Sequence, residues 1–357
     1  MIQVTKPFFP PLEEYSEYLK GAWDREWITN NGPLVNRLEE ELISYLGIDN
    51  LLFTGNGTIA LQIAIKALEL KGEIITTPFT YVATASSIFW EGCTPVFVDI
   101  DNSTFNIDSD KIESAITDQT SAILATHVFG NPCEVERIGE IARRNNLKVI
   151  YDAAHCFGTT FKGKSIFNWG DISTASFHAT KIYHTVEGGA VISSNSNLFQ
   201  RMRYMRNFGH DGPYKFNGVG INGKNSELHA AMGLTNLKYI DEILHKREQQ
   251  FLFYKECLEG LELEFQKPES EAEINHSYFP IVLSNEEVTG KLELELAENE
   301  IFARRYFYPS LNTLDYLSGE VPISEDIAAR ILCLPLYHDL KNSEQAKICD
   351  IISGCIE

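Results

Sequence analysis

Two short segments of the chain place ionisable side chains where acid–base and covalent chemistry can occur. Asp152 follows the apolar run 149–151, and Lys181 follows the run 174–177, so each group stands beyond a predicted strand. A carboxylate can keep a pyridine nitrogen protonated, and a lysine amine can form a Schiff base with an aldehyde. Each residue alone has an ordinary explanation, because aspartates often end strands and most lysines are solvated. Together they predict a site that can hold an electron-withdrawing pyridinium ring.

A glycine-containing turn supplies a candidate site for an anion. The segment 55–58, Gly-Asn-Gly-Thr, joins a predicted strand to a predicted helix, whose first N–H groups are free to bind a phosphate. It is neither GxGxxG nor a Walker loop, so dinucleotide and triphosphate chemistry are not indicated. A helix capped by Thr58 would give the same pattern. Ser176, five residues before Lys181, is a second hydroxyl that can reach a phosphate.

Strand-like and helical runs alternate between residues 51 and 191. Predicted strands lie at 51–54, 73–77, 95–99, 121–125 and 148–151, and predicted helices at 58–70, 80–90 and 134–144. This alternation predicts a largely parallel sheet between two layers of helices, with active groups beyond the carboxyl ends of the strands.

The flanking regions predict an N-terminal helix and a second, smaller domain. A helix is expected at 34–45, and 226–258 has the pattern of one long helix or a broken pair. The remainder contains a predicted strand at 278–283 and acidic helices at 290–298 and 325–332. We therefore divide the chain into a large domain, 1–244, which includes the N-terminal segment, and a smaller C-terminal α+β domain, 245–357.

Composition excludes several classes of protein. A formal net charge of −20 argues against binding to nucleic acid or to an anionic membrane surface. Seven cysteines without a CxxC pair predict neither a disulfide framework nor a zinc site, and they fit a reducing compartment. No signal-peptide core and no membrane-spanning run is apparent. The sequence thus predicts a soluble cytoplasmic protein with no metal.

Eight ordered segments resemble the DegT/DnrJ-type sugar-nucleotide aminotransferases, a family of fold-type I pyridoxal 5′-phosphate enzymes. They are TNNGP at 29–33, GNGTIAL at 55–61, TPFTYVAT at 77–84, PVFVDI at 95–100, DAAH at 152–155, SFHATK at 176–181, EGGA at 187–190 and GINGKNSE at 220–227. The resemblance covers nearly the whole chain. It implies an aspartate-aminotransferase-like α/β fold, a three-layer sandwich with a mostly parallel central sheet plus a smaller C-terminal α+β domain.

The resemblance also implies roles for individual residues. Lys181 would form the Schiff base with pyridoxal phosphate, Asp152 would pair with the ring nitrogen, and His155 would lie beside the ring hydroxyl. We take these three as the catalytic residues. The further cofactor contacts that the resemblance implies are Tyr81, which would stack on the ring, and the phosphate-binding residues Gly57, Thr58, Ser176 and Asn222 of the partner subunit. The implied assembly is a homodimer with shared active sites.

The implied reaction moves an amino group from L-glutamate to a keto-sugar nucleotide, with pyridoxamine phosphate as the intermediate form of the cofactor. Relatives that act at C4 tend to carry His-Ala before the lysine and Glu-Gly-Gly after it, as at 178–179 and 187–189. We therefore predict conversion of dTDP-4-dehydro-6-deoxy-D-glucose to dTDP-4-amino-4,6-dideoxy-D-glucose for O-antigen and lipopolysaccharide biosynthesis. Predicted substrate contacts are Thr29, Asn30, His178, His184, Glu187, Arg304, Tyr306 and Tyr308.

Several alternatives stay open at this point. One is a C3 aminotransferase that acts on a 3-keto-6-deoxy nucleotide sugar, and another is a catalytically silent binding or regulatory protein with the same fold. Sugar 3-dehydratases of the family typically have histidine in place of the lysine, so Lys181 argues against that reaction. Lys224 stands where many relatives have arginine, which retains the charge without the planar fork. The nucleotide base and the residue that binds the donor carboxylate are not assigned.

Overall fold

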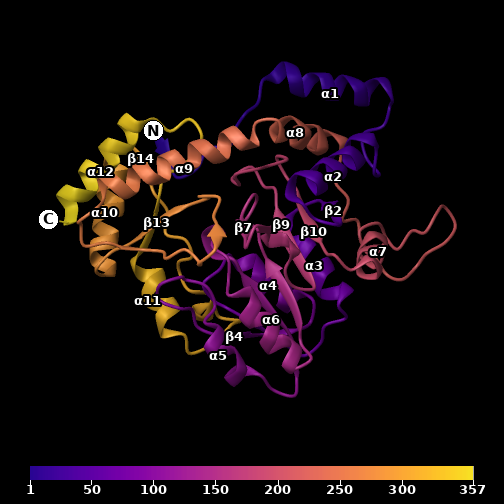
Figure 1. Cartoon of the computed structure of the whole chain (residues 1–357), viewed down its shortest axis with the longest axis horizontal. Coiled ribbons are helices and arrows are strands. Elements are labelled where there is room, and N and C mark those ends of the chain that lie inside the picture. The colour runs from indigo at the N-terminus through magenta and orange to yellow at the C-terminus, as the bar shows by residue number, and fades with distance from the viewer. Residues whose placement is uncertain (357) are drawn as a thin grey trace.

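The computed structural model, which describes residues 1–356, is built around a seven-stranded sheet (Figure 1). In spatial order its strands are β2 (Leu51–Thr54), β10 (Gly189–Ile192), β9 (Ile172–Ser176), β6 (Lys148–Asp152), β5 (Thr120–Thr126), β3 (Glu73–Thr76) and β4 (Thr94–Phe97). Neighbours from β9 to β4 run parallel, whereas β10 is antiparallel to both β2 and β9. The predicted, mostly parallel sheet is therefore confirmed.

Helices cover both faces of this sheet, because alternate strand residues point into two separate apolar cores. Phe53 and Tyr151 pack in one core, together with residues of the helices α2 (Pro33–Leu46), α6 (Val135–Arg144) and α8 (Glu227–Leu237). Their neighbours Leu52 and Ile150 pack in the other core, with residues of α3 (Gly57–Ala67), α4 (Val82–Trp90) and α7 (Ser196–Met205). The result is the expected three-layer α/β sandwich.

The first two thirds of the chain contain the helices expected at 34–45, 58–70, 80–90, 134–144 and 226–258, and three that the sequence did not predict, at 12–24, 109–112 and 196–205. They are α1 (Leu12–Asp24), α2 (Pro33–Leu46), α3 (Gly57–Ala67), α4 (Val82–Trp90), α5 (Ser109–Ile112), α6 (Val135–Arg144), α7 (Ser196–Met205), α8 (Glu227–Leu237) and α9 (Ile240–Cys257). The region expected at 226–258 is thus a broken pair of helices. A small sheet is formed by β12 (Ala272–Glu273), β7 (Thr160–Phe161) and β8 (Lys164–Ser165).

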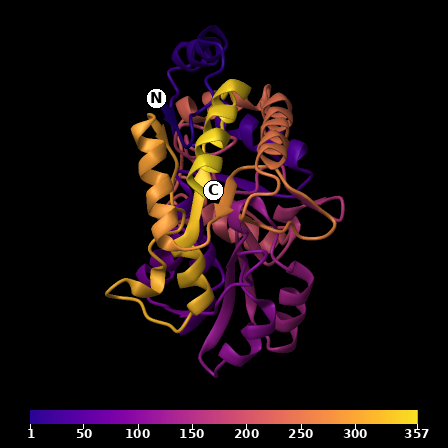
Figure 2. The same ribbon diagram turned by 90° about the vertical axis from the view of Figure 1, so that its left-hand side faces the viewer.

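The C-terminal part has its own sheet and its own core. Its elements are β11 (Glu264–Phe265), β13 (Phe279–Val282), α10 (Glu286–Glu298), β14 (Ile301–Phe302), α11 (Pro322–Arg330), β15 (Ile331–Leu334) and α12 (Asn342–Ile356). Figure 2 shows α10 and α12 side by side on the outside of this part. The predicted helix 325–332 is wrong at its end, because the buried apolar residues from Ile331 onward pair with β13 as β15.

The N-terminal segment contacts both parts of the molecule. Strand β1 (Ile2–Gln3) runs parallel to β14, and Ile2 packs in the C-terminal core. Leu336 N donates to Val4 O at 3.0 Å, and Thr5 Oγ1 donates to Thr180 O, beside Lys181, at 3.3 Å. The domain boundary expected at 244/245 falls inside α9 and stays a prediction.

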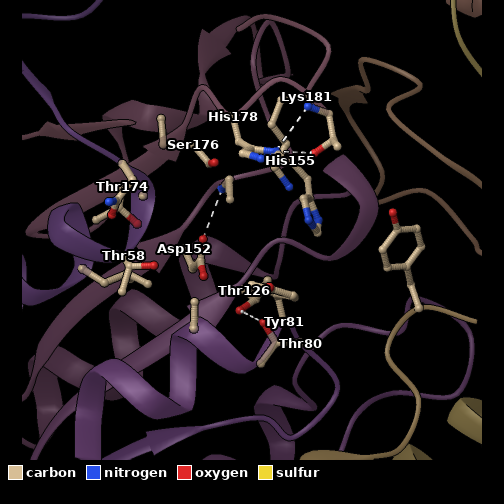
Figure 3. A pocket seen from close by; sticks show the side chains of 18 of the residues that line it. Thr58, Thr80, Tyr81, Thr126, Asp152, His155, Thr174, Ser176, His178 and Lys181 are labelled. Carbon is tan, nitrogen blue, oxygen red and sulfur yellow. Dashed lines mark hydrogen bonds between the residues drawn. The ribbon is translucent and has the colours of Figure 1, made fainter. Parts of the chain in front are cut away.

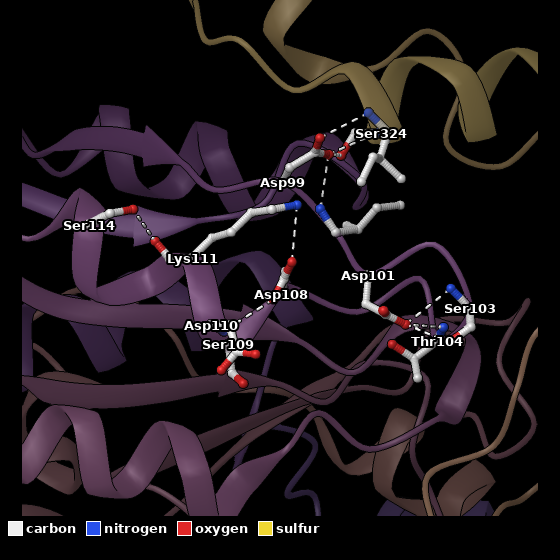
Figure 4. A network of polar contacts seen from close by, with 12 residues as sticks. Asp99, Asp101, Ser103, Thr104, Asp108, Ser109, Asp110, Lys111, Ser114 and Ser324 are labelled. Carbon is white, nitrogen blue, oxygen red and sulfur yellow. Dashed lines mark hydrogen bonds and ion pairs between the residues drawn. The ribbon is translucent and has the colours of Figure 1, made fainter.

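One carboxylate ties the large sheet to the C-terminal part (Figure 4). Asp99, just beyond β4, accepts hydrogen bonds from the backbone N–H groups of Ile323 and Ser324 at 2.9 and 2.8 Å. The Ser324 hydroxyl donates to the same carboxylate at 2.6 Å. Because these donors belong to the first turn of α11, Asp99 satisfies N–H groups that the helix leaves free and favours its dipole.

Membrane-spanning character is absent from the described helices. None of those within residues 1–356 is both long enough and apolar enough to cross a bilayer.

Candidate active site

A single pocket collects most of the predicted site residues beyond the carboxyl ends of the parallel strands (Figure 3). The predicted residues that line it are Gly57, Thr58, Tyr81, Asp152, His155, Ser176, His178, Lys181, Glu187, Arg304 and Tyr306. Residues 57–187 come from the large sheet and its loops, and the last two come from the C-terminal part. The pocket therefore lies where the two parts meet.

The turn between β2 and α3 forms a cradle for an anion. Asn56 caps α3, with its Oδ1 accepting from Ile59 N at 2.8 Å. Within residues 1–356 the N–H groups of Gly57 and Thr58 have no hydrogen-bond partner, and neither have the hydroxyls of Thr58 and Ser176. Free N–H groups at a helix N-terminus, with two hydroxyls beside them, suit a phosphate.

The strand opposite this turn approaches so closely that only glycine fits. A Cβ on Gly189 would stand 2.5 Å from Asn56 C and 2.6 Å from Gly57 N. A Cβ on Gly57 would lie 3.1 Å from the Cβ of Ser176. The glycines therefore bring Ser176 against the helix N-terminus, where both can serve one ligand.

Asp152 is held by a chain of hydroxyl groups. Its side chain is only 6% exposed, and Oδ2 accepts from Thr84 Oγ1 at 2.7 Å while Oδ1 accepts from Ala154 N at 3.2 Å. Thr80 Oγ1 lies 2.9 Å from both Thr84 Oγ1 and Thr126 Oγ1. Since Thr84 gives its only proton to the carboxylate, Thr80 must donate to Thr84 and Thr126 to Thr80. The chain points every proton toward Asp152.

Burial and these hydrogen bonds act on Asp152 in opposite directions. Burial raises the pKa of Asp152 above the usual range, and the hydrogen bonds from Thr84 and Ala154 and the nearby Lys181 oppose that rise. A cationic partner in the pocket would favour the anion further.

His155 is buried and neutral. Burial holds the pKa of His155 well below its ordinary value. Its Nδ1 accepts from Phe129 N at 3.2 Å, so the proton of the neutral ring resides on Nε2. The ring stacks on Phe307 with centroids 5.9 Å apart and planes 7° apart. His155 is thus a hydrogen-bond donor of fixed orientation in the lining of the pocket.

Lys181 is partly buried, and burial lowers the pKa of its amine to about 8, although the Asp152 carboxylate opposes that shift. Its Nζ donates a long hydrogen bond to the phenol oxygen of Tyr278, at 3.4 Å. A lysine with this pKa is available as a neutral amine near physiological pH.

Exposed and aromatic side chains form the rim. Tyr81, the residue before α4, is 56% exposed and lines the pocket. His178 Nε2 lies 3.6 Å from Glu187 Oε1. The Arg304 guanidinium stands 4.8 Å from the centre of the Tyr306 ring. These side chains lie at the rim of the pocket and outside the apolar core, so they are accessible to a substrate.

Five predicted residues lie outside this pocket. His184, 2% exposed, is paired with Phe8 O at 2.8 Å and anchors the N-terminal segment. Tyr308 donates to Glu286 at 2.8 Å. Thr29 and Asn30 lie in the exposed bend between α1 and α2, and Asn222 accepts from Lys224 at 2.6 Å. Their predicted substrate and cofactor roles stay predictions.

Several residues that shape the site were not predicted from the sequence. They are Thr80, Thr84, Thr126, Tyr278 and Phe307. Thr126 ends β5 and Thr80 follows β3, so hydroxyls at neighbouring strand ends were an available signal. No local pattern marks Tyr278, because its partner Lys181 is far away along the chain.

A family model of the DegT/DnrJ/EryC1/StrS aminotransferases matches residues 12–353. The chain belongs to this family. It is a PLP-dependent sugar aminotransferase with the corresponding α/β fold.

Individual relatives are similar over almost the full length of this aminotransferase. It is 43% identical to the dTDP-4-amino-4,6-dideoxy-D-glucose transaminase of Shigella dysenteriae over 349 residues, 96% of this chain and 95% of the relative. The transaminase of the same name from Escherichia coli is 40% identical, with 99% and 98% covered. The crystal structure of DesI in the presence of its TDP-sugar product superposes with a TM-score of 0.94 at 32% identity, with 99% and 93% covered.

The described residues fit the cofactor of the family. The cradle at α3 suits a phosphate, Asp152 suits a protonated ring nitrogen, and Lys181 suits an aldehyde carbon. These groups face one pocket, and the close approach at Gly189 leaves the N–H groups of the turn open to a ligand.

Proposed function

We propose that this aminotransferase transfers the amino group of L-glutamate to C4 of dTDP-4-dehydro-6-deoxy-D-glucose. The product is dTDP-4-amino-4,6-dideoxy-D-glucose, a precursor of O-antigen amino sugars. The observation that carries the proposal is that Lys181 and Asp152 line one pocket in a chain that matches two transaminases of this name over nearly its whole length.

Pyridoxal phosphate bound in this pocket supplies an electron sink and a carrier for the amino group. The residues that would hold it are Gly57, Thr58 and Ser176 at the phosphate, Tyr81 at the ring face, and Asp152, His155 and Lys181 around the ring.

Lys181 performs the proton transfers of the reaction. Its amine takes the proton from Cα of the donor, and in the second half of the reaction it delivers a proton to the carbon that becomes the amine-bearing carbon of the sugar. A pKa of about 8 suits both directions, since neither the neutral nor the charged amine is strongly disfavoured near neutral pH.

Asp152 and His155 set the electrostatics of the pocket. The Asp152 carboxylate, directed by the chain of threonine hydroxyls, keeps a ring nitrogen protonated and thus electron-withdrawing. His155, with its proton on Nε2, donates to an anionic ring oxygen without adding a charge.

The rim groups provide the proposed substrate contacts. Arg304 and Tyr306 offer a cation and an aromatic face for the sugar nucleotide, and His178 with Glu187 offers polar groups to the sugar. Arg304 makes no ion pair within residues 1–356, whereas the neighbouring Arg305 is paired with Glu286 at 2.9 Å. Arg304 is therefore the arginine of this pair that remains available to an anionic substrate.

The experiment that tests the proposal is an assay of the purified enzyme with L-glutamate and a panel of 3-keto and 4-keto sugar nucleotides. We expect amination of the dTDP-linked 4-keto-6-deoxy sugar, identified by mass spectrometry and NMR of the product. Amination of 3-keto sugars alone would show that C3 is the position, while the enzyme class would stand. No turnover of any keto sugar would favour a silent protein with this fold.

We further propose that the active enzyme is a homodimer in which Asn222 of the partner subunit completes the phosphate site. The segment that follows α7 extends away from the body of the molecule (Figure 1). It exposes large apolar side chains, with Tyr214 95%, Val219 89% and Phe216 63% exposed. Apolar surface of this kind commonly marks a protein contact.

A complementation experiment tests the shared site. A Lys181→Ala subunit still supplies Asn222 to the site of its partner, and an Asn222→Ala subunit still supplies its own Lys181. A heterodimer of the two variants would therefore keep one intact site. We expect a refolded equimolar mixture to recover roughly a quarter of wild-type activity, well above either variant alone. An activity no higher than the average of the two separate variants would contradict the sharing of Asn222.

A further inference from the structure

Tyr278 is the only residue of the C-terminal part, among those described, whose side chain makes a polar contact with Lys181. Its phenol oxygen lies 3.4 Å from Lys181 Nζ, across the boundary between the two parts of the molecule. We propose that Tyr278 is a positioning residue that holds the Lys181 amine whenever this amine is not covalently engaged. The inference rests on the role proposed above for Lys181 and adds a residue to it.

The chemistry of a phenol matches both proton states of the amine. A charged ammonium donates a hydrogen bond to the phenol oxygen, and a neutral amine accepts one from the phenol O–H. Burial raises the pKa of Tyr278 far above its usual range, so the phenol keeps its proton. A group that shuttles protons passes through both states, and Tyr278 can hold it in each.

Aromatic neighbours fix the ring of Tyr278. It packs edge-on against His155 with centroids 4.9 Å apart, and against Tyr306 at 5.3 Å. It also lies 5.3 Å from Phe129 at a tilt of 50°. These contacts use the faces and edges of the ring, so phenylalanine would retain them, and only the hydroxyl reaches Lys181.

The backbone just before Tyr278 is anchored to the large domain. Asn275 Nδ2 donates to His155 O at 2.7 Å, and Ser277 Oγ donates to the same oxygen at 2.8 Å. The buried Arg247 of α9 donates to Ser277 O at 3.1 Å. The backbones next to His155 and Tyr278 therefore belong to one hydrogen-bond network. This network fixes the position of the Tyr278 phenol relative to Lys181.

The test is Tyr278→Phe, compared with Tyr183→Phe as a matched control. Tyr183 is a buried tyrosine two residues from Lys181, and its hydroxyl has no hydrogen-bond partner within residues 1–356. We expect Tyr278→Phe to load the cofactor and to keep KM for glutamate within about threefold of wild type. The rate of the glutamate half-reaction should fall roughly tenfold to a hundredfold, and the kinetic isotope effect with [2-²H]glutamate should rise.

A second measurement uses cofactor-free protein and needs no turnover. The rate at which an acylating reagent labels Lys181, followed by mass spectrometry across pH, reports the midpoint for deprotonation of the amine. Since hydrogen bonds to charged groups are stronger than those between neutral groups, loss of the phenol should lower this midpoint below that of the wild type. Tyr183→Phe should leave the midpoint and the isotope effect unchanged.

An unchanged isotope effect together with an unchanged labelling midpoint in Tyr278→Phe would overturn the inference. A Tyr183→Phe variant with the same changes would do so as well, because a general effect on the pocket would then explain them. Neither result would touch the proposed function, which depends on product formation by the wild-type enzyme.

Discussion

Replacing Lys181 with alanine should lower turnover by more than about 10³-fold, because the reaction loses its proton carrier. The variant should still fold, since alanine removes a partly buried side chain whose one polar partner within residues 1–356 is Tyr278. The measurement is formation of 2-oxoglutarate from L-glutamate, and of amino sugar from the keto-sugar nucleotide. Wild-type-like activity would contradict the assignment of Lys181 as the proton carrier.

Two further measurements show whether Lys181 acts as a base. A small amine such as methylamine should restore part of the activity of Lys181→Ala, because it can occupy the vacated space and carry protons. Lys181→Arg should stay inactive, since a guanidinium does not deprotonate in proteins. Rescue by the arginine variant would show that only the charge at this position matters.

Replacing Asp152 with asparagine should lower kcat by about 10²- to 10³-fold while the protein retains its fold. Asparagine keeps the size of the side chain, and its amide oxygen can still accept from Thr84, but the negative charge is lost. Without that charge the side chain at position 152 no longer keeps a ring nitrogen protonated. The measurement is the single-turnover rate with glutamate, with the circular dichroism spectrum as a check on folding.

A graded control for Asp152 comes from the residue that orients it. Thr84→Val removes the 2.7 Å hydrogen bond but leaves the carboxylate, so we expect a smaller loss, of roughly tenfold. If Asp152→Asn were as active as wild type, or if Thr84→Val were the more damaging change, the proposed electrostatic role of Asp152 would be wrong.

The large domain could be predicted from the sequence because its signals are local. Buried parallel strands such as β3 and β5 are apolar runs, and each is followed by turn residues and a helical pattern. Asp152 ends β6 and Lys181 lies in the loop that follows β9, so the topology alone brings them to one edge of the sheet. The C-terminal part is less regular. For that reason the sequence pattern predicts the start of β15 as the end of the preceding helix.

The parts of the site that the sequence did not reveal depend on contacts between distant segments. The link between Tyr278 and Lys181 spans 97 residues, and the chain from Thr126 to Asp152 joins three separate segments. His184 is another example, because its ring binds the backbone oxygen of Phe8, far away along the chain. Its predicted substrate contact stays a prediction.

The pairing of β1 with β14 bears on how the enzyme matures in the cell. Ile2 leaves the ribosome before its partner Ile301, which is translated about 300 residues later, roughly 15 to 60 s at usual elongation rates. Until then the opening residues have no strand to join, and Thr5 is not yet held in place to reach the carbonyl of Thr180. The surroundings of Lys181 are therefore completed only after Ile301 has been translated.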